Sequence, residues 1–123
     1  MNISEAESAV MELLWVKHPQ SAEDIIKQLK DDGSDWQEAT VKTLLNRLLK
    51  KRCIAAKKDG RRYLYRPRVA RTDYVASRSS QLLDRLFGGR VAPLVAHFSE
   101  QGKLTKKDIE EMKQLIKEIE RGK

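Results

Sequence analysis

Short polar, amide and basic side chains gather between residues 38 and 51, and no acid follows Glu38 in that stretch. Arg, Lys and Asn are the residue types that pair with base edges and phosphates in the major groove of DNA. A solvated helix face normally mixes charges of both signs instead. We therefore interpret this stretch as a recognition helix that contacts DNA. Its predicted DNA contacts are Thr40, Lys42, Thr43, Asn46, Arg47 and Lys50.

The helical interpretation rests on the apolar residues of the same stretch. They recur at positions i, i+3, i+4, i+7 and i+8, which places them on one face of a helix. The stripe consists of Val41, Leu44, Leu45, Leu48 and Leu49. Such a stripe must be covered by other elements, so we expect the outward polar face to be presented by a small helical core.

Two helices are predicted ahead of the recognition helix. Ser4 with Glu7 three residues later is the pattern of a capping box, and the helix should end near Lys17 because a proline follows. Ser21 is a suitable N-cap for the second helix, which should end in the turn-forming residues 31–34. The recognition helix then follows as the third.

A β-hairpin is predicted after the third helix. Asp59-Gly60 separates two extended runs, and both residue types tolerate positive φ. Arg61 and Arg62 would lie at its tip as further DNA contacts. Three helices followed by a basic hairpin form a winged helix-turn-helix, in which the third helix enters the major groove and the wing contacts the backbone or minor groove.

Basic charge is concentrated in this part of the chain. Residues 42–68 hold eleven Lys and Arg against the single acid Asp59, although the chain as a whole carries a net charge of only +7. A one-sided patch of this kind attracts polyanions.

Residues 71–123 are predicted to form a second, helical domain beside a winged-helix domain of residues 1–70. Helices are expected at 71–87 and 93–100, and a last one is capped by Thr105 with Asp108 three residues on. These helices are too short and too apolar on one side to stand alone in water, so we expect a homodimer. The predicted dimer contacts are Leu82, Leu83, Leu86, Phe87, Leu94, Phe98, Met112, Leu115, Ile116 and Ile119.

Other classes of function find no support in the composition. No apolar run approaches the roughly 18 residues of a membrane span, and we expect a cytoplasmic protein. Cys53 is the single cysteine and is expected to be a small buried residue. His18 and His97 lie far apart, so we expect no metal site. The sequence shows no catalytic constellation, so we expect no enzyme activity and no cofactor.

The chain resembles the penicillinase and methicillin-resistance repressors (BlaI/MecI type) over nearly its whole length. The most specific matching segments are Thr40–Leu48 and Leu83–Gly89. Other matches lie at residues 3–15, 63–65 and 93–98.

This resemblance implies a transcriptional repressor that binds dyad operator DNA as a homodimer and controls β-lactam-resistance or related cell-envelope genes. In antibiotic-responsive members a sensor-linked protease pathway cleaves the segment that matches His97 and Phe98. Three residues depart from the family pattern. His97 stands where those members typically have Asn, so the resemblance does not decide whether this chain is cleaved. Arg52 replaces a Gly that is common after the recognition helix, and Gln37 replaces the usual Ser at its start.

Two alternatives remain at this point. The basic patch could bind an acidic protein partner through the same winged-helix fold. Binding to RNA or single strands ranks last, because such sites use exposed aromatics for stacking and the basic helix has none.

Overall fold

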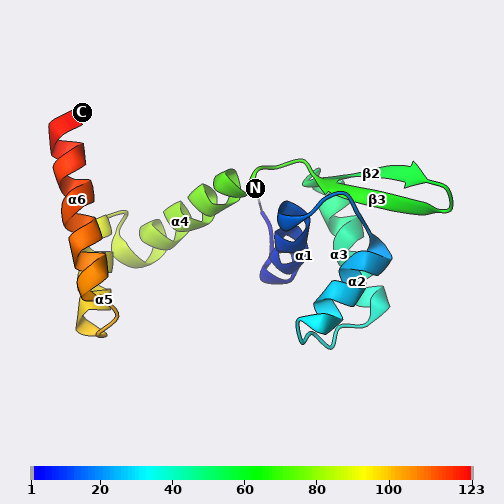
Figure 1. The fold of residues 1–123 in the computed structure, drawn as a ribbon, viewed down its shortest axis with the longest axis horizontal. Helices are drawn as coiled ribbons and strands as arrows, with labels where there is room; N and C mark the ends of the chain where they lie inside the picture. The colour runs from blue at the N-terminus through cyan, green and yellow to red at the C-terminus, as the bar shows by residue number, and fades with distance from the viewer. Residues whose placement is uncertain (1, 123) are drawn as a thin grey trace. The chain divides into compact units, whose positions relative to one another are not determined.

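The computed structural model describes residues 2–122, which divide into two compact units between Ser77 and Arg78 (Figure 1). The N-terminal unit contains α1 (Glu5–Val16), β1 (Gln20–Ser21), α2 (Ala22–Asp31), α3 (Glu38–Lys50), β2 (Ile54–Asp59) and β3 (Arg62–Pro67). Helix α4 (Arg71–Phe87) begins in this unit and continues into the C-terminal unit, which also contains α5 (Val91–Glu100) and α6 (Lys106–Gly122). The predicted class, mainly helical with a small β-hairpin, is confirmed.

Hydrogen-bonded caps fix where the first two helices begin. The Ser4 hydroxyl accepts from the Glu7 amide at 3.1 Å, and the Glu7 carboxylate accepts from the Ser4 amide at 2.9 Å. Ser21 and Asp24 form the same reciprocal pair at the start of α2. Each box satisfies two backbone amides that a helix start otherwise leaves without partners.

The core of the N-terminal unit lies between α1, α2 and α3. Its buried hydrophobic side chains are Ile3, Val10, Met11, Leu14, Ile25, Ile26, Leu29, Val41, Leu44, Leu45, Leu48, Cys53 and Ile54. Trp36, which lies in the chain between α2 and α3, packs against this cluster. The apolar stripe of α3 is thus its inward face, and Leu49 at the edge of that stripe is half-buried.

The sheet has three strands rather than the two of a simple hairpin, in the order β1-β3-β2. The two-residue strand β1 pairs antiparallel with β3, Gln20 opposite Tyr65 and Ser21 opposite Leu64. A strand this short has no periodicity of its own, which is why the sequence did not predict it. Gln20 is buried, and its side-chain amide donates to the carbonyls of Leu13 (3.0 Å) and Lys17 (2.7 Å).

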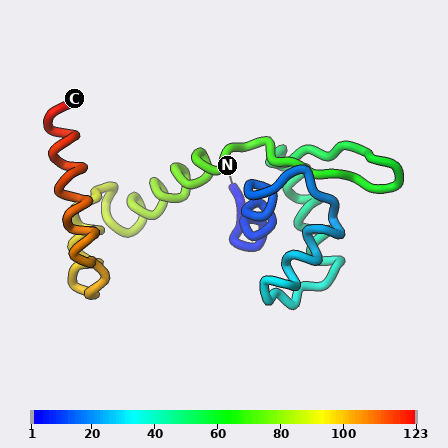
Figure 2. Tube along the Cα trace, viewed as in Figure 1, coloured from blue at the N-terminus to red at the C-terminus, as the bar shows by residue number. Residues whose placement is uncertain are grey.

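The turn of the hairpin lies one residue later than the Asp-Gly pattern suggested. Asp59 still belongs to β2 and pairs with Arg62, so Gly60 and Arg61 are the two turn residues. Gly60 has φ of 65°, whereas Arg61 keeps a negative φ. Glycine with positive φ at the first turn position is the pattern of a type II′ turn. The turn forms the free end of the hairpin, away from α1 (Figure 2).

The first turn of α4 is fixed to α1. The Trp15 indole N–H donates to the Val69 carbonyl at 2.9 Å, and its ring lies 5.4 Å from the Tyr74 ring. Arg71 Nε lies 2.9 Å from a carboxylate oxygen of Glu12. The strand-to-helix connection is therefore held by contacts that are distant in sequence.

The C-terminal unit has no closed core of its own. None of the described residues of α4, α5 and α6 is fully buried. Helix α5 begins at Val91, two residues before the predicted start, and Pro93 fits in its first turn because no intrahelical acceptor is needed there. The predicted cap of α6 is present, with the Thr105 hydroxyl accepting from the Asp108 amide at 3.0 Å.

Candidate nucleic-acid interface

The outward face of α3 carries all six of its predicted DNA contacts. Thr40, Lys42, Thr43, Asn46, Arg47 and Lys50 are exposed, while the opposite stripe is buried. Burial of that stripe against α1 and α2 fixes the rotation of the helix about its axis. The structure therefore gathers these side chains on one surface.

Some of these groups are engaged within the helix, and others are available. Lys42 Nζ lies 3.7 Å from the Glu38 carboxylate, an exposed i,i+4 pair of small energy. The Thr43 hydroxyl donates to the Ala39 carbonyl at 2.9 Å, which leaves its methyl group and an acceptor lone pair outward. Within residues 2–122, Asn46, Arg47 and Lys50 form no side-chain hydrogen bond or ion pair.

The two ends of α3 differ from the standard pattern in the residues that the sequence singled out. Gln37 occupies the N-cap, and its side chain makes no capping hydrogen bond to any described residue. At the other end Arg52 adopts φ of 62°. The Cys53 amide donates to the Leu48 carbonyl (2.9 Å) and the Arg52 amide to the Leu49 carbonyl (3.0 Å), which is the Schellman motif.

Lys51 belongs to the basic patch by sequence, but its ammonium group is directed toward α1. Its Nζ donates to a carboxylate oxygen of the buried Glu7 at 2.6 Å and to the Asn2 carbonyl at 2.8 Å. Burial raises the pKa of Glu7, but the hydrogen bonds from Lys51 and Ser4 and the Lys51 charge outweigh it, so the pKa lies below its ordinary value. This ion pair ties the end of α3 to the start of α1, and the sequence did not predict it.

The hairpin carries the second group of predicted contacts. Arg61 lies in the turn, exposed and without a side-chain partner among the described residues. Arg62 pairs across the turn with Asp59 at 3.4 Å, an exposed pair that DNA can replace at small cost. Lys57 and Lys58 on β2 are also exposed, although they were not predicted as contacts.

The two tyrosines of β3 lie two residues apart, on one face of the strand, but differ in exposure. Tyr65 packs against the core, and burial raises its pKa. Tyr63, nearer the free end of the hairpin, is half exposed. It lies opposite Lys58, so the wing carries one exposed aromatic side chain beside a basic one.

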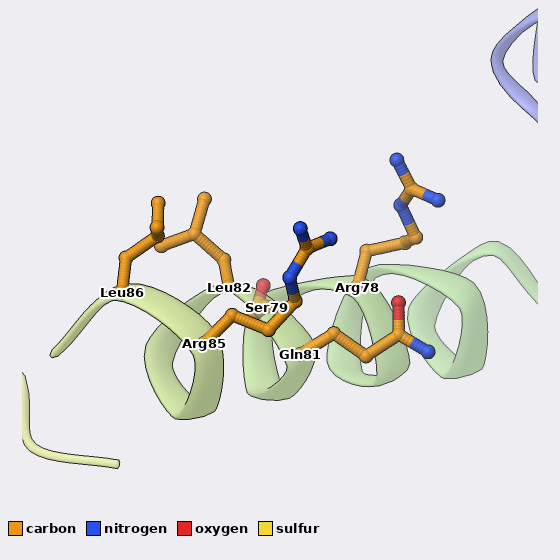
Figure 3. A pocket seen from close by; sticks show the side chains of 6 residues that line it. All are labelled: Arg78, Ser79, Gln81, Leu82, Arg85 and Leu86. Atoms are coloured by element: carbon orange, nitrogen blue, oxygen red, sulfur yellow. The ribbon is translucent and has the colours of Figure 1, made fainter. Parts of the chain in front are cut away.

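The predicted dimer contacts lie on the C-terminal unit and expose much apolar surface. Leu82 and Leu86 line a groove along one side of α4, flanked by Arg78 and Arg85 (Figure 3). Phe98, Leu115, Ile116 and Ile119 are also exposed, whereas Leu83, Phe87, Leu94 and Met112 are half-buried. Val75, Val91 and Ile109 add exposed apolar area that the prediction left out.

The predicted cleavage segment lies inside α5. The His97 ring packs 5.9 Å from the Phe87 ring and 5.2 Å from the Phe98 ring. The side chains of His97 and Phe98 are exposed, but the backbone of both residues is helical.

No group of three or more His, Cys, Asp or Glu side chains among residues 2–122 is arranged to hold a metal ion. No helix among them is long and apolar enough to cross a membrane.

Known proteins match the chain over most of its length. Residues 3–118 match the family model described as "Penicillinase repressor". A penicillinase repressor of Bacillus licheniformis is 33% identical over 116 residues, which is 94% of this chain and 90% of the relative. The methicillin resistance regulatory protein MecI of Staphylococcus aureus (strain N315) is 33% identical over 114 residues, 93% of this chain and 92% of the relative.

Solved structures match more than half of the chain. The solution structure of the DNA-binding domain of the repressor BlaI has a TM-score of 0.55 at 36% identity and covers 59% of this chain and 88% of that one. The monomeric form of Bacillus licheniformis BlaI in complex with the blaP half-operator has a TM-score of 0.52 at 35% identity and covers 60% and 89%. On the family match and these relatives, the chain belongs to the penicillinase repressor family.

Proposed function

We propose that this protein is a transcriptional repressor that binds dyad operator DNA as a homodimer. The observation that carries the proposal is the outward face of α3, where Asn46, Arg47 and Lys50 are exposed and have no partner in residues 2–122. That face belongs to a fold shared with the DNA-binding domain of BlaI, and the similar monomeric form of Bacillus licheniformis BlaI has been solved in complex with the blaP half-operator.

Helix α3 enters the major groove in this proposal. Residues near the start of a recognition helix reach base edges, and basic groups farther along reach phosphates. Thr43, with its hydroxyl already donating to Ala39, presents a methyl group suited to the methyl of thymine. Arg47 has the length and the two-pronged geometry to bind a guanine or a phosphate.

The hairpin acts as a wing beside the groove. Arg61 at the turn and Arg62 next to it extend toward the sugar-phosphate backbone or the minor groove. Their contribution is mainly electrostatic, because phosphate contacts position the protein without reading sequence.

The homodimer rests on the C-terminal helices. Helices that leave Leu86, Ile116 and Ile119 more than half exposed gain stability when a second copy covers them. A two-fold dimer also presents two copies of α3, which is the arrangement that a dyad operator requires. The helical unit beyond α4 is thus the dimerisation domain in this proposal.

We infer the regulated genes from the names of the relatives, and the release of DNA from the resemblance of this chain to antibiotic-responsive repressors. The relatives are named as a penicillinase repressor and a methicillin resistance regulatory protein, so we place this chain over β-lactam-resistance or related cell-envelope genes. Release by cleavage before Phe98 requires α5 to unfold locally first, because the segment is helical. A sensor-linked protease would then weaken the dimer, because the cut separates the end of α5 and all of α6 from the rest of the chain.

Footprinting tests the proposal. The purified full-length protein is applied to the promoter region of its own operon, in the presence of excess random-sequence DNA. We expect protection of a dyad whose half-sites are spaced by whole helical turns, about 10–10.5 base pairs each. Uniform weak protection along the fragment, or none, would contradict the proposal and favour an acidic protein partner.

A further inference from the structure

Three helices among residues 2–122 end in the same backbone motif, but one of them has an unusual residue at the position that needs positive φ. Helices α2, α3 and α5 close with the paired hydrogen bonds of the Schellman motif. The motif needs a residue with positive φ just past the helix. Gly33 (φ 96°) and Gly102 (φ 70°) fill that position after α2 and α5, and Arg52 (φ 62°) fills it after α3.

Arg52 is the only non-glycine residue with positive φ among residues 2–122. A residue with a Cβ atom is strained in this conformation, and glycine is not. The fold therefore loses stability by having arginine here. Nothing in the motif itself requires a side chain, because its hydrogen bonds use only backbone atoms.

The Arg52 side chain gives the fold no compensating contact. It is exposed, and its guanidinium has no hydrogen bond or ion pair within residues 2–122. Its neighbour behaves differently: Lys51 is bonded to Glu7 and Asn2, so its charge is turned toward the protein. At this end of α3, Arg52 therefore carries an unpaired positive charge, whereas the charge of Lys51 is paired within the protein.

We propose that Arg52 is an additional DNA-phosphate contact, placed at the end of the recognition helix at the expense of folding stability. This inference rests on the proposed function and deepens it. An arginine at the helix end can bind a phosphate with paired N–H groups and does not read sequence. It should strengthen binding to operator and non-operator DNA alike.

Four variants of the full-length protein separate charge from backbone strain. Arg52→Gly and Arg52→Asn remove the charge and relieve the strain, since both residues tolerate positive φ. Arg52→Lys keeps the charge and the strain. Lys117→Asn, on α6, is the control for loss of one positive charge elsewhere in the chain.

Affinity is measured by titration on a duplex carrying the footprinted dyad and on its scrambled version, across a series of salt concentrations. We expect Arg52→Gly and Arg52→Asn to weaken both complexes by the same factor. The slope of log affinity against log salt should fall by about 0.9 for each protomer bound. Arg52→Lys and Lys117→Asn should keep the wild-type slope. Thermal unfolding should show Arg52→Gly melting about 4–8 °C above the wild type if the strain is about 1 kcal/mol in a small domain.

The outcomes are distinguishable. If the wild type prefers the dyad but Arg52→Gly keeps its full slope, the phosphate contact is refuted and the repressor function stands. If the wild type binds dyad and scrambled duplexes equally, the proposed function itself fails. A slope that falls equally in Lys117→Asn would show an effect of net charge alone and would also overturn the contact.

Discussion

Arg47 is the side chain of α3 that we expect most strongly to contact DNA. It is exposed, has no partner within residues 2–122, and lies next to the buried Leu48 that fixes the orientation of the helix. Removal of an exposed, unpaired guanidinium should leave folding unchanged. Its loss from the interface should weaken binding to DNA.

We expect Arg47→Ala to weaken operator binding by about 10–100-fold, the usual range for one well-placed arginine. Titration of the footprinted duplex measures this, and sedimentation shows whether the dimer persists. Lys117→Ala on α6 is the matched control and should bind as the wild type does. An Arg47→Ala protein that fails to fold would show that this side chain supports the core.

Glu7 illustrates a residue whose role depends on groups far away in the sequence. Its carboxylate closes the cap of α1 and also accepts from Lys51 at the end of α3. Because its pKa in the folded protein lies below the ordinary value of 4.5, ionised Glu7 stabilises the fold. That contribution is complete above the unfolded pKa and is lost as the pH falls through the folded pKa.

Glu7→Gln should therefore lower the free energy of unfolding by about 1–2 kcal/mol at neutral pH, since glutamine keeps the cap but not the charge. Urea denaturation at several pH values measures the difference. The gap between variant and wild type should shrink as the pH falls below 4.5. Glu5→Gln, in the same turn of α1, is the control and should show a much smaller effect. A gap that does not change with pH would contradict the ion pair.

Among the elements, the wing depends on a single glycine. Gly60 has φ of 65° at the first position of a two-residue turn that joins β2 and β3. We expect Gly60→Ala to lower the free energy of unfolding by about 1 kcal/mol, because a Cβ atom is strained there. Gly60→Asn, which tolerates positive φ better, should lose less. Denaturant titration of both variants checks the order, and an alanine variant as stable as the asparagine one would refute this turn conformation.

Local patterns in the sequence were enough to predict most of the elements. The capping box at Ser4, the apolar stripe of α3 and the cap at Thr105 each involve residues within a few positions of one another. Such patterns act through helical geometry alone. For the same reason the sequence placed the outward residues of α3 on one face, and the structure confirms that face.

Features formed between distant segments could not be predicted in this way. Strand β1 exists because Gln20 and Ser21 meet β3, more than forty residues later. The Lys51 side chain is directed toward the protein because it pairs with Glu7 in another helix. From sequence alone, this lysine was counted with the basic side chains of the patch. The Asp59-Gly60 pattern predicted the hairpin, but cross-strand pairing decided that Gly60 and Arg61 form its turn.

At the scale of the whole molecule, the C-terminal helices set the oligomeric state in our proposal. Ile119 on α6 is 68% exposed and should lie in the dimer interface. We expect Ile119→Glu to give a monomer at micromolar concentration in sedimentation equilibrium, because burying a carboxylate in an apolar interface is costly. Lys117→Glu introduces a similar charge on the opposite side of α6 and should remain a dimer. A dimeric Ile119→Glu protein, or a monomeric wild type, would contradict this interface.

The central claim is that the dimer recognises a specific duplex through α3 and the wing. Equilibrium affinity for the footprinted dyad and for a scrambled duplex of the same composition, each measured over a series of salt concentrations, tests it most directly. We predict tighter binding to the dyad at every salt concentration, with log affinity falling linearly by about 0.9 per phosphate neutralised. Equal affinity for the two duplexes would contradict sequence-specific recognition, and affinity independent of salt would contradict a role for the basic patch.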